Sequence, residues 1–148
     1  MKKSKSALFL MELIIVIFFF ALTAAVCLRL FVSAHTISRR TKVINQAVLW
    51  SSNCAEIFEE YAEDKFAVLD EVAKAIGQRY VDDGDGAVFF IDKDFSFVSE
   101  PSFYKMSLRF SEDDDYRYQY FSYEKEDNKE VVYSREIKKH KREVPCLE

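Results

Sequence analysis

Hydrophobic residues are concentrated at the start of the chain. Every position from Ala7 to Leu28 is apolar except Glu12 and Thr23. As a helix, the 21 residues of Leu8–Leu28 span about 31 Å, which matches the roughly 30 Å hydrocarbon core of a bilayer. The pattern therefore predicts a transmembrane helix within residues 8–34.

The pattern changes to an amphipathic one after this segment. Apolar residues recur at three- and four-residue steps, the period of a helix with one buried face: Val43, Ala47, Trp50, Cys54, Ile57, Phe58 and Tyr61. No Gly or Pro occurs between Met1 and Lys74. We therefore expect one long helix from about Leu8 to about residue 63. A second, short helix is expected over 65–77, with Gly77 as its C-cap.

Residues 87–140 begin with a short apolar run, Ala87–Ile91, and then alternate between apolar and polar positions, with short polar turns between the runs. This period of two predicts an antiparallel β-meander with one buried face. Tyr116, Tyr118 and Tyr120 share one phase, and Phe121 continues in the other. We expect a β-bulge between Tyr120 and Phe121, with the tyrosines on the half-buried face. The predicted fold is α+β: a long N-terminal transmembrane and amphipathic helix packed on a C-terminal antiparallel meander.

Composition narrows the functional classes. The 148-residue chain has a formal charge of −4, so no specific nucleic-acid partner is expected. Two His and three Cys are too few and too scattered for a zinc module. The sequence contains no phosphate-binding glycine loop, nucleophile elbow or metal-ligand pair at helical spacing. We therefore predict no catalytic residue, cofactor, metal site or small-molecule substrate, and expect that the protein is not an enzyme.

Basic residues flank the apolar segment on both sides. Those before it favour a cytoplasmic N-terminus: Lys2, Lys3 and Lys5. Those after it oppose that orientation: Arg29, Arg39, Arg40 and Lys42. A cleaved signal peptide is the alternative, because Val32-Ser33-Ala34 is also compatible with a cleavage site that would leave His35 first.

Glu12 is the one ionisable residue inside the apolar segment. A carboxylate at the centre of a membrane helix costs roughly 2.5–3.5 kcal/mol on insertion scales, and less near the interface. Glu12 either reaches the interface or awaits a positive partner from another molecule. Ionisable residues in membrane segments are candidates for function by default.

The stretch from Ser6 to Ile17 resembles the processing signature of type IV pilins and type II secretion pseudopilins. In that family a basic leader ends in a small residue, prepilin peptidase cuts after it, and the new N-terminus is methylated. The resemblance assigns Ala7 as the last leader residue and Leu8 as the methylated N-terminus. It assigns Glu12 as the glutamate that pairs with a neighbouring subunit's terminal amine during assembly.

The resemblance implies a leader (1–7), a transmembrane and polymerisation helix (8–34), and an extracytoplasmic head (35–148). Three residues depart from the family pattern: Ala7 instead of Gly, Phe9 instead of Thr, and no Pro near Arg29. The first bears on the rate of processing, and the last two favour a minor pilin or pseudopilin over a major fibre subunit. The implied partners are other pilins or pseudopilins, prepilin peptidase and an assembly platform protein.

The implied location is the plasma (inner) membrane, crossed once with the N-terminus in the cytoplasm, and then a filament at the cell surface or in the periplasm. The filament would serve secretion, DNA uptake, adhesion or motility. The alternative is a single-pass ligand-binding or adhesion protein that does not polymerise.

Two features of the head are left open by the sequence. Cys54 and Cys146 would both lie outside the cytoplasm, where disulfides persist, so they form a candidate disulfide. The run Asp82-Asp83-Gly84-Asp85-Gly86 offers three carboxylates to a calcium ion. However, Asp-Gly pairs also favour turns, and the run lacks the Glu that would complete an EF-hand. A plain turn is the preferred interpretation.

Overall fold

The computed structural model describes residues 2–141, with side chains described from Ser6 onward. The chain divides into two compact units, Met1–Lys42 and Val43–Glu148. The helices are α1 (Lys2–Tyr61) and α2 (Lys65–Ile76). The strands are β1 (Val81–Asp82), β2 (Gly86–Ile91), β3 (Phe97–Val98), β4 (Tyr104–Glu112), β5 (Tyr116–Lys125) and β6 (Val131–His140).

The first unit consists of the N-terminal part of α1. Among the described residues, α1 is the helix that is long and apolar enough to cross a membrane. Its apolar side chains are exposed, from Leu8 at 64% to Phe20 at 75% and Ile37 at 62%. A helix in the core of a soluble protein would bury such side chains. The segment is therefore a candidate membrane span or signal anchor.

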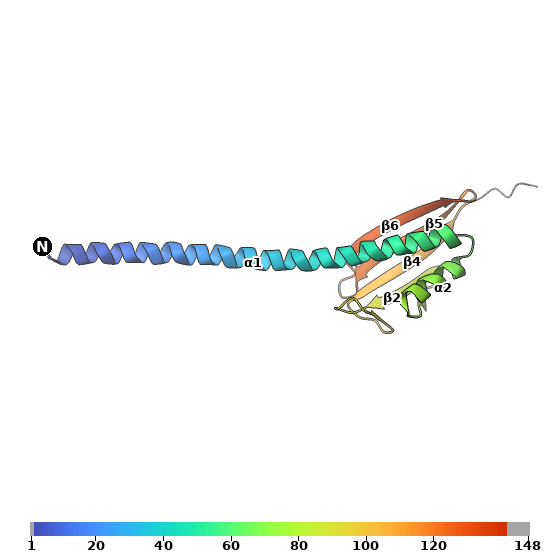
Figure 1. Cartoon of the computed structure of the whole chain (residues 1–148), viewed down its shortest axis with the longest axis horizontal. Helices are drawn as coiled ribbons and strands as arrows, with labels where there is room; N and C mark the ends of the chain where they lie inside the picture. The colour runs from blue at the N-terminus through green and yellow to red at the C-terminus, as the bar shows by residue number, and fades with distance from the viewer. Residues whose placement is uncertain (1, 142–148) are drawn as a thin grey trace, which may run out of the picture. The chain divides into compact units, whose positions relative to one another are not determined.

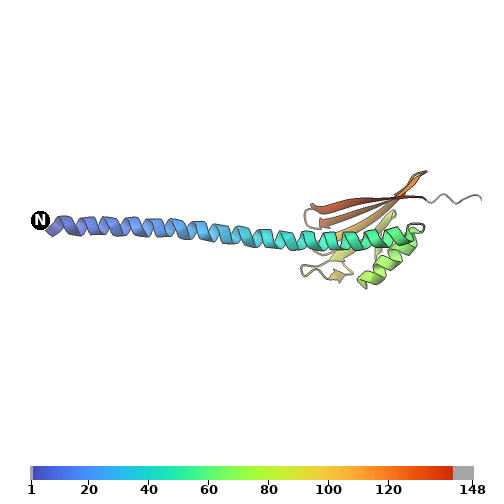
Figure 2. The ribbon, with the colours of Figure 1, turned by 45° about the horizontal axis from the view of Figure 1, so that its top comes forward.

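The second unit is a two-layer α+β fold. Its sheet is antiparallel, with strand order β1-β2-β4-β5-β6 and β3 paired to β2. The C-terminal part of α1 crosses the sheet, and α2 packs on the same face beside it (Figures 1 and 2). This arrangement confirms the predicted α+β fold, in which a long N-terminal helix packs on a C-terminal antiparallel sheet.

The face of α1 that packs on the sheet follows the predicted stripe. Val43, Ala47, Cys54 and Phe58 are buried. Ser51 lies on the same stripe and is also fully buried. Ala47 and Ser51 are the small residues of this buried side. Tyr61, predicted to belong to the stripe, is 37% exposed where α1 ends.

Local capping fixes both ends of α2. The side chain of Asp64 accepts a hydrogen bond from the backbone N–H of Phe66 at 2.8 Å, which is an N-cap. Gly77 adopts φ +75°, and its N–H donates to the carbonyls of Ala73 and Lys74. This is the predicted glycine C-cap. The turn between α1 and α2 therefore ends in a capped helix that buries Val68, Leu69 and Val72.

The prediction of a β-bulge between Tyr120 and Phe121 is wrong. β4 and β5 pair without interruption from Tyr104↔Lys125 to Glu112↔Arg117. The register shift between β5 and β6 lies instead at Tyr123/Glu124. Because the alternation is unbroken, Phe121 and Tyr123 face the helices, and Tyr116, Tyr118 and Tyr120 lie on the opposite face of the sheet.

Phe58 tests how much the contact between helix and sheet stabilises the second unit. Its ring is 2% exposed and lies 6.2 Å from the ring of Phe110. Phe58→Ala should lower the free energy of unfolding by about 3–5 kcal/mol, because it leaves a cavity in the core. Urea unfolding of the full chain in detergent, followed by the fluorescence of Trp50, the one tryptophan, measures this loss.

Phe66→Ala is the matched control. Phe66 is 61% exposed, so its substitution should change the free energy of unfolding by no more than about 0.5 kcal/mol. Equal losses in the two variants would contradict the packing described.

Candidate functional site

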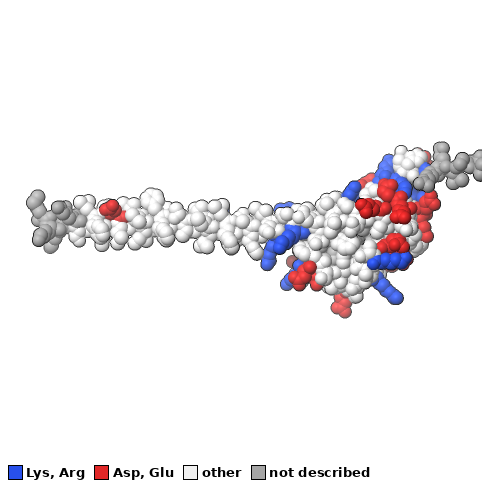
Figure 3. Space-filling model, in the orientation of Figure 1, with Lys and Arg blue, Asp and Glu red and all other residues white. Residues whose placement is uncertain are grey.

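The exposed surface of the first unit is the strongest candidate site. Its N-terminal part is almost free of charge (Figure 3). The hydroxyl of Thr23 donates to the carbonyls of Phe20, at 2.9 Å, and Phe19, at 3.1 Å. Thr23 therefore satisfies its donor inside its own helix, as a hydroxyl in a bilayer must.

Glu12 is different from Thr23. Its side chain is exposed, and no side chain from Ser6 to Lys141 pairs with it. It is the one charged residue between Ser6 and Leu28. Because a lone carboxylate in an apolar medium is costly, Glu12 is a candidate for pairing with a cation from another molecule.

Ala7, Leu8 and Glu12 all lie within α1 and are exposed. Leu8 and Glu12 are four residues apart, so they share one side of the helix about one turn from each other. Any positive group at Leu8 of a neighbouring chain can therefore meet Glu12 when the two helices are offset by about one turn. The structure thus places the predicted N-terminal residue, Leu8, and the predicted assembly residue, Glu12, one helical turn apart.

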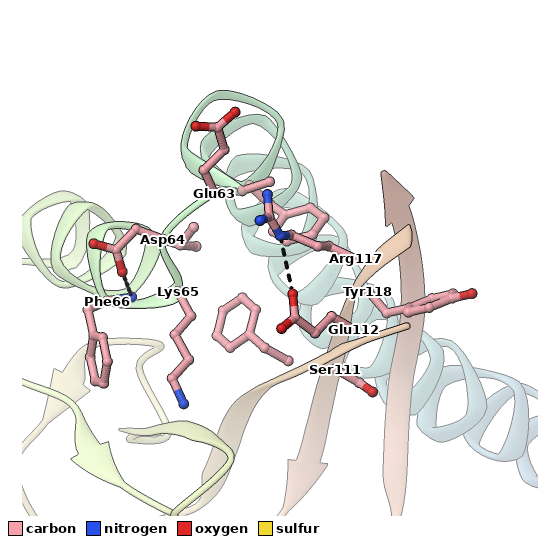
Figure 4. A pocket seen from close by; sticks show the side chains of 12 residues that line it. Glu63, Asp64, Lys65, Phe66, Ser111, Glu112, Arg117 and Tyr118 are labelled. Atoms are coloured by element: carbon pink, nitrogen blue, oxygen red, sulfur yellow. Dashed lines mark hydrogen bonds and ion pairs between the residues drawn. The ribbon is translucent and has the colours of Figure 1, made fainter. Parts of the chain in front are cut away.

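A second candidate is a pocket of about 450 Å³ in the head, between the end of α1, the start of α2 and strands β4 and β5. We call it the α1–β5 pocket. Its inner wall is apolar, from Phe58, Ala62, Val68 and Phe110. Its rim is charged and includes Glu63, Asp64, Lys65, Glu112 and Arg117 (Figure 4). This pocket could not be predicted from the sequence, because residues more than 50 positions apart form it.

Ion pairs organise the β4–β5 side of this rim. The Glu112 carboxylate lies 3.5 Å from Arg117 Nε (Figure 4) and 3.5 Å from Lys141 Nζ. Lys139 Nζ also lies 3.9 Å from the Glu59 carboxylate. These pairs tie β6 to the ends of β4 and α1. Pairs this exposed are each worth only a fraction of a kcal/mol, so they position the rim more than they stabilise it.

Asp113 closes the turn between β4 and β5. Its carboxylate accepts hydrogen bonds from the hydroxyl of Tyr118 at 2.7 Å and from the backbone N–H groups of Tyr116, at 2.7 Å, and Asp115, at 3.0 Å. The Tyr118 hydroxyl and these amides lower the pKa of Asp113. The same hydrogen bond, from the other side, raises the pKa of Tyr118 to about 12.

The acidic run at residues 82–86 forms a turn that leads into β2. The Gly84 N–H donates to Asp82 Oδ1 at 2.9 Å, and Gly84 has φ +80°. Asp83 lies 3.9 Å from Arg109. Within the described part of the chain, no group of His, Cys, Asp or Glu side chains is placed to hold a metal ion. The preferred interpretation as a turn agrees with this geometry.

Cys54 is fully buried against the sheet. Burial raises the pKa of its thiol to about 12. Its predicted partner, Cys146, lies outside the described residues, so the disulfide stays a prediction.

Comparison of the chain with protein-family models, with curated proteins and with solved structures found no match. The long apolar helix followed by an antiparallel sheet agrees with a pilin-like architecture.

The Asp113 turn makes the stability of the head sensitive to acid. Because the pKa of Asp113 is lower in the folded chain, its contribution is present above the unfolded pKa of about 3.9 and is lost as pH falls through the folded value. Thermal unfolding of the full chain between pH 7 and pH 2 should therefore show a steeper fall of Tm at acid pH than in Asp113→Asn. Asp114→Asn is the control in the same turn and should keep the wild-type profile. Identical acid profiles for wild type and Asp113→Asn would contradict this role.

Proposed function

We propose that this chain is a structural subunit, a minor pilin or pseudopilin, of a type IV pilus or type II secretion-like filament. The observation that carries the proposal is the exposed apolar part of α1, with Glu12 as its one charged residue four positions after Leu8. The α+β head behind a long helix supports the same family.

The mechanism begins in the membrane. The apolar helix is held in the bilayer with the leader in the cytoplasm, and prepilin peptidase cuts between Ala7 and Leu8. The cut creates an α-amino group at Leu8, which is then methylated and remains a cation. Neither this cation nor the Glu12 carboxylate is stable alone in an apolar medium, but the two together offset part of the desolvation cost.

Assembly follows from the same surface. When subunits leave the bilayer, the apolar side chains of α1 lose their lipid contacts. Packing against the helices of other subunits buries those side chains again. The pairing of Glu12 with a neighbour's Leu8 amine fixes the axial offset, because apolar surfaces alone slide easily past one another. The platform protein and the other pilins are the partners of this step.

The cleavage site tests the first half of the proposal. When the chain is produced with a prepilin peptidase, mass spectrometry or N-terminal sequencing should find a mature start at Leu8. Ala7→Leu should leave Met1 in place in most of the protein, because a large residue fills the position where the peptidase takes a small one. A matched control, Ala21→Leu, changes the same residue type deeper in the helix and should be cleaved normally. An intact Met1 start in the wild type, or a start at His35, would favour a non-polymerising anchor or a secreted protein instead.

Glu12 tests the assembly step separately. Glu12→Ala should insert and be cleaved normally but enter filaments at least about tenfold less, since about 1.4 kcal/mol of lost pairing is a factor of ten. Sheared filaments and membrane fractions, quantified by immunoblot, give this ratio. Thr23→Val is the control, because the Thr23 hydroxyl is satisfied inside its own helix. Normal assembly of Glu12→Ala would remove the role assigned to Glu12.

A further inference from the structure

The face of the sheet opposite the helices carries a polar groove. We call it the outer groove. It has a volume of about 480 Å³ and runs over β4, β5 and β6. This volume lies within the range of small-ligand sites, about 300–1,000 Å³. Its main lining residues are Arg109, Tyr120, Ser122, Glu124, Ser134 and Glu136.

The strand register creates the groove. Ser122 on β5 pairs directly with Ser134 on β6, so two small side chains form its floor. The next pair on the same face is Tyr120↔Glu136, and Arg109 stands beside Tyr120 on β4. Large side chains therefore stand as a wall along one side of a floor of hydroxyl groups.

Tyr120 provides the aromatic side chain of the groove. Its ring is nearly parallel to that of Tyr118, at an interplanar angle of 14° and a centroid distance of 6.3 Å. Tyr118 lies on the side of Tyr120 away from Ser122, because the three residues alternate along one strand face. Tyr120 is 40% exposed, so part of its ring is accessible to a ligand in the groove.

The polar groups of the groove carry charges of both signs. Arg109 is basic, and Glu124 and Glu136 are acidic. Arg135 also borders the groove, but it pairs with Phe121, whose side chain faces the helices. Ser122 donates to Glu124 at 3.1 Å, and Arg109 makes a long contact of 3.9 Å with Asp83. The excess of carboxylates disfavours a polyanion such as nucleic acid.

The backbone of β5, at the centre of the groove, is unavailable to an added strand. β5 is hydrogen-bonded to β4 on one side and to β6 on the other, so a peptide cannot bind over it by β-augmentation. The floor also lacks an apolar socket for a side-chain anchor, since Ser122 and Ser134 occupy it. What remains is an aromatic face beside hydroxyl, carboxylate and guanidinium groups.

We propose that the outer groove binds a short stretch of an uncharged polysaccharide. The apolar C–H face of a sugar ring lies on Tyr120, and its hydroxyls hydrogen-bond to Ser122, Ser134, Arg109 and Glu136. Each of these groups can donate to or accept from a hydroxyl, and charged partners make the stronger bonds. The inference goes beyond assembly and does not depend on it, because every residue lies in the head.

Saturation-transfer NMR on the full chain tests the groove. The chain is held in dodecylphosphocholine micelles, because a detergent with a sugar headgroup would compete. The probes are the β-1,4-linked tetramer of N-acetylglucosamine and maltotetraose, both uncharged. We expect transfer to ring protons of at least one probe. Tyr120→Ala should weaken binding by at least roughly fivefold, the loss expected for removing one good contact.

Two matched tyrosine substitutions locate the site. Ser134→Tyr fills the floor and should abolish transfer. Ser111→Tyr makes the same change at an exposed position on the same face of β4 but outside the outer groove, and should leave binding intact. Circular dichroism checks that both variants fold.

Two results would overturn the proposal. The first is no saturation transfer to either tetrasaccharide at about 10 mM, a concentration far above the Kd of ~1 mM of a weak complex. The second is an equal loss of binding in Ser134→Tyr and Ser111→Tyr. Preferential binding of a single-stranded DNA oligonucleotide, blocked by Ser134→Tyr, would assign the outer groove to a polyanion instead.

Discussion

The exposed apolar surface of the first unit is the constraint on which the rest of this protein depends. Burying one large apolar side chain contributes about 1.5–3 kcal/mol, and this unit exposes such side chains from Leu8 to Ile37. The surface must be covered by lipid, by other protein, or by each in turn. Within it, the proposed pairing of the Glu12 carboxylate with a neighbour's amine would add a contact with a defined position to non-directional apolar packing.

The head uses the same helix for a different purpose. From Val43 onward, α1 carries apolar residues on one side only, and these build the core with the inner face of the sheet. Ala47 and Ser51 are fully buried small residues on this side of α1, and Phe58 is a buried aromatic residue farther along it. One element thus provides both the exposed apolar surface and the core, because no Gly or Pro interrupts it before Gly77.

The outer face of the sheet shows how β-pairing places polar chemistry. Tyr116, Tyr118 and Tyr120 form an aromatic row there. Lys138 Nζ lies over Tyr116, 3.6 Å from the ring centroid, and farther from Tyr118 at 5.5 Å. Beyond the row, the pair Ser122↔Ser134 opens the outer groove. The edge strand beside the groove, β6, carries Arg135, Lys138 and Lys139. Basic side chains on an edge strand discourage pairing with other sheets, so strand addition at this edge is disfavoured.

The elements whose cause is local could be predicted from the residues alone. The apolar run fixed a membrane-length helix, the three- and four-residue period fixed the buried side of α1 at Val43, Ala47, Cys54 and Phe58, and Gly77 fixed the end of α2. The buried face of β5 could be assigned only from the three-dimensional fold, because both faces of the strand carry aromatic residues and packing against α1 is what distinguishes them. The fold likewise decided the burial of Ser51 and the existence of the α1–β5 pocket and the outer groove, since those features arise where distant strands and helices meet.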